Sequence, residues 1–142
     1  MSYTPGTLWN KITQLEASKV AINTYAGSTS VKSDLINSYA WDTAIVYIQE
    51  AGNINYANQT SKNSSLSNTG ANADEVCKIN DMASNVTEWT TEYSSSTFSN
   101  YAYPCTDRGG DCGYSGVYAA SRNNLGATYS SNGLGFRLSL YL

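Results

Sequence analysis

Apolar residues in the first third of the chain are spaced as in two helices. Residues 34–50 carry an apolar side chain at every fourth position, with aromatic neighbours, as expected of a helix packed on a core. This stripe consists of Ile36, Ala40, Ala44 and Ile48. We expect Ser33 or Asp34 to cap the helix and the Ala-Gly-Asn sequence at 51–53 to end it.

The earlier helix is predicted by its start signal. Thr13 and Glu16 have the spacing of a capping box, in which each side chain accepts a hydrogen bond from the backbone N–H of the other residue. We expect a helix over about 14–25, ended by the Gly-Ser-Thr-Ser sequence at 27–30. The residues expected to share one side of it are Leu15, Val20, Ala21 and Thr24.

The rest of the chain changes from a polar stretch to alternating patterns. Residues 52–74 contain few large apolar side chains and predict a long irregular segment, either a mobile insertion or a loop held by the fold. Residues 86–91 and 136–142 alternate with a period of two, which predicts strands, the second of them half-buried and terminal. Helices followed by strands predict an α+β domain, and 142 residues fit a single domain spanning 1–142.

The composition narrows the classes of function. The net charge is −3 and there are only 8 Lys and Arg residues, so no nucleic-acid partner is expected. No apolar run approaches the roughly 18–20 residues of a membrane span, so no membrane insertion is expected. The first residues lack the basic and apolar segments of a signal peptide. We therefore expect synthesis in the cytoplasm, followed by a virion-associated or a cell-surface location.

The chain contains no histidine, which removes the commonest general base and the commonest zinc ligand. Its cysteines are Cys77, Cys105 and Cys112, an odd number, so not all of them can pair within the chain. Cys105 and Cys112 either form a disulfide or remain thiols. We expect no catalytic residue, no metal site and no cofactor. Calcium held by Asp, Asn and backbone oxygens is an alternative that no spaced ligand motif supports.

Three phrases in the second half resemble, in order and spacing, the formylglycine-generating-enzyme (sulfatase-modifying factor) type of C-type lectin fold. They are DMASNVTEWT at 81–90, RGG at 108–110 and GFR at 135–137. The resemblance covers residues 76–142 closely and residues 10–50 more loosely. It implies a C-type lectin-like fold with two N-terminal helices packed on short antiparallel strands and long irregular loops.

These phrases are interpreted as scaffold. Glu88 is expected to form a buried ion pair with Arg108 or Arg137, because buried charges need partners. Ser84 stands where the family usually has glycine, so we expect it to adopt the backbone geometry that the glycine serves. Thr87 stands where the family usually has an aromatic residue.

An enzyme is the less favoured hypothesis. The resemblance implies that oxidase members hold copper with a cysteine pair a few residues after the Arg-Gly-Gly phrase. Here only Cys112 follows Gly110, and soft copper sites need at least two thiolates. Asp107 and Asp111, beside the same phrase, are the remaining candidates for acid and base, and nothing in the sequence marks either as desolvated. A copper-dependent oxidase therefore stays an alternative.

Residues 101–135 are rich in Tyr, Asn, Ser and Gly and contain no Lys, Glu, Gln, Met or Trp. This pattern looks like the variable proteins of diversity-generating retroelements of phages or bacteria, in which mutated Asn codons cannot reach those five residue types. The resemblance implies that this region varies and binds cell-surface partners. Polar turn-rich loops also avoid long charged residues for ordinary reasons, so both interpretations stay open.

We therefore expect a ligand-binding display protein whose rigid tyrosines and adaptable polar side chains contact a cell-surface protein or glycan. The expected contacts are Tyr101, Tyr103, Asp107, Asp111, Tyr114, Tyr118, Asn123, Asn124, Tyr129 and Asn132. A third alternative is a structural head domain of a phage tail fibre or surface fibre. In that case the protein would be a trimer, with the tyrosine-rich face buried between subunits.

Overall fold

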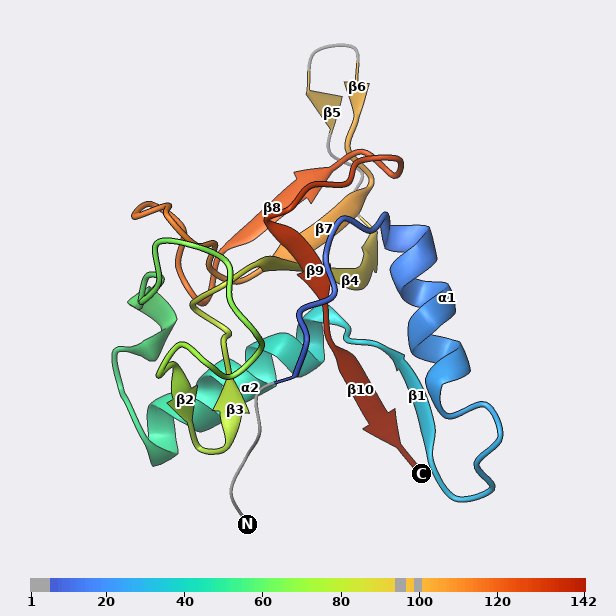
Figure 1. Cartoon of the computed structure of the whole chain (residues 1–142), viewed down its shortest axis with the longest axis horizontal. Helices are drawn as coiled ribbons and strands as arrows, with labels where there is room; N and C mark the ends of the chain where they lie inside the picture. Colours follow the sequence, from blue (N-terminus) through green and yellow to red (C-terminus); the bar gives the residue numbers. More distant parts are fainter. Residues whose placement is uncertain (1–5, 94–96, 99–100) are drawn as a thin grey trace.

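A mixed four-stranded sheet in the order β8–β7–β4–β9 lies at the centre of the computed structural model, which describes residues 6–93, 97–98 and 101–142 (Figure 1). At 97–98 and 101–102 only the backbone is described. β4 runs antiparallel to β7 and parallel to β9, and β7 runs antiparallel to β8. The strands are β4 (Thr87–Tyr93), β7 (Cys105–Arg108), β8 (Arg122–Leu125) and β9 (Leu134–Phe136).

Three two-stranded antiparallel sheets accompany it. They pair β1 (Lys32–Leu35) with β10 (Leu138–Tyr141), β2 (Glu75–Val76) with β3 (Ile79–Asn80), and β5 (Thr97–Phe98) with β6 (Tyr101–Ala102). The single terminal strand predicted over 136–142 is therefore divided at Arg137. β9, which ends at Phe136, pairs with β4, and β10, which begins at Leu138, pairs with β1. Leu140 and Leu142 are exposed, so only the first part of that strand is half-buried as predicted. With two helices, the architecture is α+β.

The first predicted helix is confirmed as α1 (Gln14–Thr24), with both hydrogen bonds of the Thr13–Glu16 capping box present. Its buried residues are Ala17 and Ala21, whereas Leu15 is exposed. The predicted side is therefore right for Ala21 and the half-buried Val20 and wrong for Leu15 and Thr24. The small alanines let α1 pack closely on β1, which the spacing of larger apolar residues could not reveal.

The second helix, α2, spans Ser38–Ala51 and ends at Gly52 as predicted, but its predicted start is wrong. Ser33 and Asp34 lie in β1, opposite Leu140 and Ser139 of β10. The cap is Asn37, whose side chain accepts a hydrogen bond from the Ala40 N–H at 2.8 Å. Pairing with the end of the chain, more than 100 residues away in sequence, decides the conformation here.

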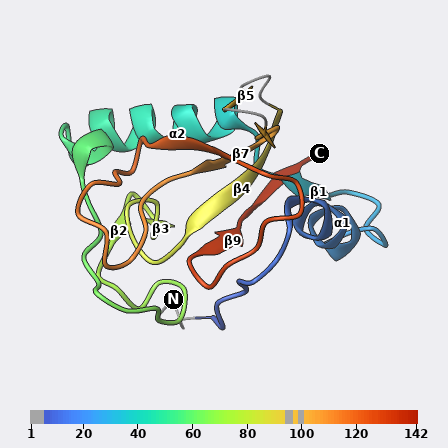
Figure 2. The ribbon, with the colours of Figure 1, turned by 90° about the horizontal axis from the view of Figure 1, so that it is seen from above.

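The two helices bury separate apolar clusters. β4 contributes Trp89 to the cluster with Ala17 and Ala21 of α1, and the Trp89 indole N–H donates to the Ile12 carbonyl at 2.9 Å. The second cluster joins α2, through Trp41, to residues just before β4, including Met82. Figure 2 shows α2 lying along the sheet, whereas α1, seen end-on, lies beside β1.

The long polar segment is held by the fold. It contains the short 3-10 helix η1 (Tyr56–Asn58) and returns to the core at Asp74, which is 1% exposed. The Asp74 carboxylate accepts hydrogen bonds from the Tyr56 hydroxyl at 3.0 Å, the Gln59 amide at 2.9 Å and the Ala83 N–H at 3.1 Å. These bonds tie the start and end of the loop to the phrase at 81–90.

The scaffold phrases contact each other through their backbones. The Gly110 N–H donates to the Met82 carbonyl at 3.1 Å, and a Cβ on Gly110 would lie 1.8 Å from the Ala83 oxygen. The left-handed residues in this phrase are Asp81 (φ 59°) and Asn85 (φ 73°), and Ser84 is not one of them. Among the described residues, no helix is long and apolar enough to cross a bilayer.

Candidate functional site

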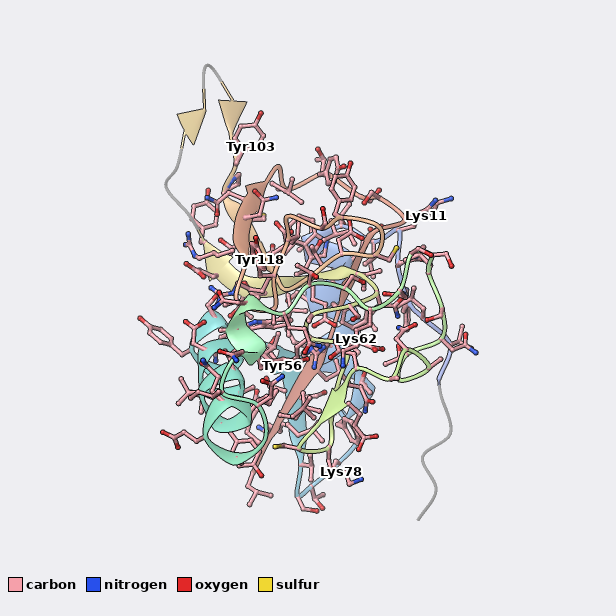
Figure 3. All side chains as sticks on the ribbon, turned by 90° about the vertical axis from the view of Figure 1, so that its left-hand side faces the viewer. Lys11, Tyr56, Lys62, Lys78, Tyr103 and Tyr118 are labelled. Atoms are coloured by element: carbon pink, nitrogen blue, oxygen red, sulfur yellow. The ribbon has the colours of Figure 1, made fainter. Side chains whose placement is uncertain are left out.

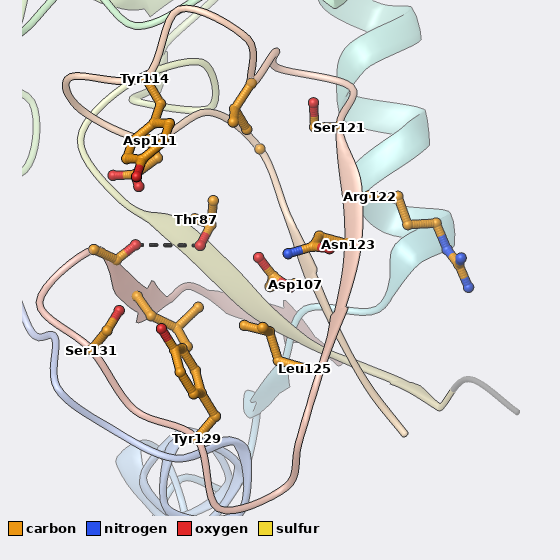
Figure 4. Close-up of a pocket in the computed structure, with 14 residues that line it drawn as sticks. Thr87, Asp107, Asp111, Tyr114, Ser121, Arg122, Asn123, Leu125, Tyr129 and Ser131 are labelled. Atoms are coloured by element: carbon orange, nitrogen blue, oxygen red, sulfur yellow. Dashed lines mark hydrogen bonds between the residues drawn. The ribbon is translucent and has the colours of Figure 1, made fainter. Parts of the chain in front are cut away.

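A pocket of about 310 Å³ opens at one end of the central sheet (Figure 4). Every residue that lines it, except Thr87 of β4, lies between Asp107 and Leu134, inside the segment at 101–135. Five of the ten predicted contact residues are among them: Asp107, Asp111, Tyr114, Asn123 and Tyr129. The pocket is thus formed by loops and strand edges around a floor of β4 and β7.

Strand alternation decides which side chains enter the pocket. Asp107 of β7 and Asn123 of β8 are opposite each other in register, so they share one face of the sheet. Arg122 belongs to the opposite face, and Figure 4 shows its side chain pointing away from the other lining residues. Its guanidinium is paired with Glu92, with Nε donating to Oε1 at 2.9 Å. The strands therefore place a carboxyl and an amide inside and an arginine outside.

Asp107 is the most unusual group in the pocket. It is 2% exposed, and its Oδ1 atom has no hydrogen-bond partner among the described residues. Burial raises the pKa of Asp107 to about 6, and the negative charge of nearby Asp111 adds to this shift. No local sequence pattern marks Asp107 as desolvated, because its burial comes from the packing of the sheet.

Asp111 supplies a second carboxylate from the turn after β7. It is half-buried and lies against Gly133, where an added Cβ would be 3.1 Å from its oxygens. Burial raises the pKa of Asp111, and hydrogen bonds from Cys112 oppose that shift. Thr87 lies between the two acids and donates to the Gly133 carbonyl at 3.3 Å (Figure 4). The pocket is therefore rich in acceptor oxygens.

Tyrosines stand at the rim. Tyr114, 67% exposed, lies beside Asp111, and Tyr129, 48% exposed, lies on the far side of Thr87 next to Ser131 (Figure 4). Apolar walls are completed by Val117, Leu125 and Leu134. Exposed rings above buried polar groups combine contact area with directional hydrogen bonding, as binding sites commonly do.

Four other predicted contacts, Tyr103, Tyr118, Asn124 and Asn132, do not line the pocket. Tyr103 is half-buried beside the β5–β6 hairpin, and Tyr118 bridges to Thr60 near η1 (Figure 3). The Asn124 amide oxygen accepts from the Thr106 hydroxyl at 3.1 Å, and the Asn132 carbonyl accepts from the Asn10 amide at 2.6 Å. The side chain of Tyr101 lies outside the described residues.

Sequence reasoning missed Thr87, Ser121 and Ser131 as lining residues. Thr87 carried a signal, because it departs from the aromatic residue usual in the resembled phrase. A small hydroxyl there leaves room over Asp107 and reaches the Gly133 carbonyl. The two serines lie in the predicted segment, and nothing in their local pattern distinguished them from other loop serines.

The thiols are separate from one another. Cys77, Cys105 and Cys112 are all free, which answers the question of a Cys105–Cys112 disulfide. Cys105 is buried in the α1 cluster, and that burial raises its pKa. Within the described ranges, no group of three or more Cys, Asp and Glu side chains could hold a metal ion.

Comparisons with known proteins give a fold. No protein-family model and no curated protein sequence matches the chain. Among solved structures, PvdO from Pseudomonas aeruginosa superposes with a TM-score of 0.71 at 15% sequence identity. The match covers 100% of this chain and 65% of PvdO, so the chain spans just under two thirds of the length of that protein. At this identity the likeness shows that the chain shares its fold with PvdO, and nothing further about its activity.

Proposed function

We propose that this chain is a ligand-binding domain with a C-type lectin-like fold of the formylglycine-generating-enzyme type. It binds a cell-surface protein or glycan through the pocket and its tyrosine rim. The observation that carries this proposal is the origin of the pocket: its walls come from the segment at 101–135, apart from Thr87. A segment that lacks five residue types and supplies all but one of the residues lining a pocket suits recognition.

A division between scaffold and face supports the proposal. The carboxylates of the scaffold phrases have hydrogen-bond partners within the fold. Asp81 accepts from the Gly70 N–H at 2.6 Å, and Glu88 accepts from Arg137 Nη2 at 2.8 Å. In the pocket, by contrast, the Asp107 carboxyl keeps an unpartnered oxygen, and the rings of Tyr114 and Tyr129 are open to solvent. A ligand would satisfy groups that the fold itself leaves unused.

The same division suits diversification. We propose that the chain is a variable protein of a diversity-generating retroelement, displayed on a virion or a cell surface. Exposed rim residues such as Tyr114, Tyr129 and Ser130 can change without removing a core contact, because the two apolar clusters are formed mainly outside this rim. The ligand would then differ between variants, while the fold stays the same.

Deep sequencing of the coding region in its source population tests this function, together with a search of the neighbouring DNA for a near-copy that differs at adenines. We expect substitutions at pocket and rim codons, including those of Tyr114, Asn123 and Tyr129, and none at Glu88 or Arg137. An invariant segment without a near-copy would overturn diversification. Substitutions spread equally over scaffold and rim would contradict the assignment of this face to binding.

A further inference from the structure

The pocket contains an uncompensated negative charge. Its charged lining residues are Asp107, Asp111 and Arg122, and the arginine is paired with Glu92 and points away. The Asp107 carboxyl is almost completely buried, and its Oδ1 atom has no donor within the described part of the chain. Buried charge without a partner is unfavourable, so a positively charged donor suits this pocket.

We propose that this pocket binds a primary ammonium group, which donates a hydrogen bond to the Asp107 carboxylate while Asp111 contributes a second negative charge. This inference rests on the proposed binding function and names the chemistry of the ligand. An ammonium carries only donors, and the Thr87 hydroxyl, which gives its hydrogen to the Gly133 carbonyl, keeps its oxygen as an acceptor between the two acids.

The geometry favours an ammonium over a guanidinium. Asp107 is 2% exposed, so only a small part of its carboxylate can face the pocket. A guanidinium binds best as a planar fork on both oxygens of one carboxylate, whereas an ammonium is a compact point charge that needs one. Asp107 therefore offers no open two-oxygen edge to the pocket.

The walls suit a cation carried on a slim stem. Val117 and Leu125 provide apolar surface for methylene or ring carbons, and Tyr114 and Tyr129 provide aromatic faces at the rim. Aromatic faces attract cations, which adds to the attraction of the acids. A pocket of about 310 Å³ accepts a side chain or a single sugar rather than a folded surface.

Two matched pairs of probes test the proposal on the full chain. Nα-acetyl-lysine methylamide is compared with Nα-acetyl-norleucine methylamide, which lacks the ammonium, and glucosamine is compared with N-acetylglucosamine, whose nitrogen is neutral. Binding is followed by backbone and side-chain amide NMR shifts, including those of Asn123 and Gly133. We expect the ammonium member of at least one pair to bind about tenfold more tightly than its neutral partner. The responding pair identifies a protein or a glycan source.

Variants separate the pocket from general charge effects. Asp107→Asn and Asp111→Asn should each weaken ammonium binding about tenfold, whereas Glu50→Gln, which removes an exposed carboxylate of α2, should not. The amide spectrum outside the pocket must stay unchanged, which excludes a folding defect. Equal binding of charged and neutral probes, or no binding of either ammonium probe, overturns the proposal. If sequencing still shows variation at the rim, the ligand-binding function survives that failure.

Discussion

Arg137 and Glu88 form a buried two-point ion pair that joins the end of the chain to β4. Arg137 Nη2 donates to Glu88 Oε1 at 2.8 Å, and Nε donates to the other carboxylate oxygen. The same guanidinium lies 5.0 Å from the Trp41 ring centre and donates to the Asn80 carbonyl at 3.0 Å. Burial raises the pKa of Glu88, and the charge of Arg137 opposes that shift. One arginine thus connects α2, β3 and β4 where β9 gives way to β10.

The variant Arg137→Met tests how much this ion pair contributes to the stability of the fold. Removing one partner of a buried ion pair leaves an uncompensated charge, so we expect a loss of about 3–5 kcal/mol in the free energy of unfolding. Urea unfolding at neutral pH measures it. Lys78→Met is the control, because Lys78 is 93% exposed in its pair with Glu75. That change should cost less than about 1 kcal/mol. Equal losses in the two variants would show that the buried pair is not structurally important.

The sequence predicted this pair only in part. Glu88 is opposite Arg108 in the β4–β7 register, so a choice between Arg108 and Arg137 was reasonable. In the structure Arg108 pairs instead with Asp42 of α2. The choice depends on where the last strand crosses the sheet, which is a tertiary property. Local patterns such as the capping box and the alternation at 86–91 were predictable because they depend on neighbouring residues alone.

In the candidate site, too, local composition was informative and tertiary placement was not predictable. Composition located the segment, and five of the predicted contacts line one pocket. Strand alternation then separated Asn123, which faces the pocket, from Asn124, which bonds to Thr106 on the other face. That separation requires the register of β8 on β7, and the sequence alone did not predict β8. The burial of Asp107 likewise follows from the strands and turns around it.

Gly110→Ala tests the contact between scaffold phrases. The added Cβ would lie 1.8 Å from the Ala83 backbone oxygen, which cannot move like a flexible side chain. Overpacking costs about 1–3 kcal/mol and occasionally more, so we expect a loss of about 3 kcal/mol in thermal or urea unfolding. Gly116→Ala is the matched control, because nothing lies within 4 Å of its Cβ position. A stability loss for Gly110→Ala no larger than the control's would mean that the two phrases can separate freely.

The buried carboxyl of Asp107 makes stability depend on pH. Its pKa in the folded state is about 6, above the unfolded value, so the folded protein holds this proton more tightly than the unfolded chain. The contribution of Asp107 to stability is therefore favourable below about pH 4 and is lost as the pH rises through about 6. The charged group that adds to this shift is Asp111 on the following turn.

Asp107→Asn should remove this dependence. At neutral pH the variant should be more stable than the parent by about 2–3 kcal/mol, from a shift of about two pKa units, and the two proteins should be equal near pH 4. Urea unfolding across that range measures the difference. Glu50→Gln, an exposed carboxylate, should give a difference near zero at every pH. A pH-independent difference for Asp107→Asn would show that the carboxyl keeps an ordinary pKa.

Tyr114 and Tyr129 are the residues on which ligand binding should depend most. The double variant Tyr114→Ala with Tyr129→Ala removes both rings at the rim and should weaken binding about tenfold or more, as expected for aromatic anchors of an interface. Labelled protein on cells from the source population, followed by flow cytometry, measures it. Both rings are about half exposed or more, so the melting temperature should change by less than about 3 °C.

The matched control is Tyr25→Ala with Tyr47→Ala. These rings are 41% and 53% exposed on other surfaces, at the end of α1 and on α2, so they remove similar aromatic area away from the pocket. The control should bind cells like the parent. If it loses binding and the Tyr114 and Tyr129 variant does not, the ligand contacts the helical side, and the pocket is not the recognition site. If both lose binding, aromatic area anywhere on the surface contributes, and the specificity attributed to this pocket is wrong.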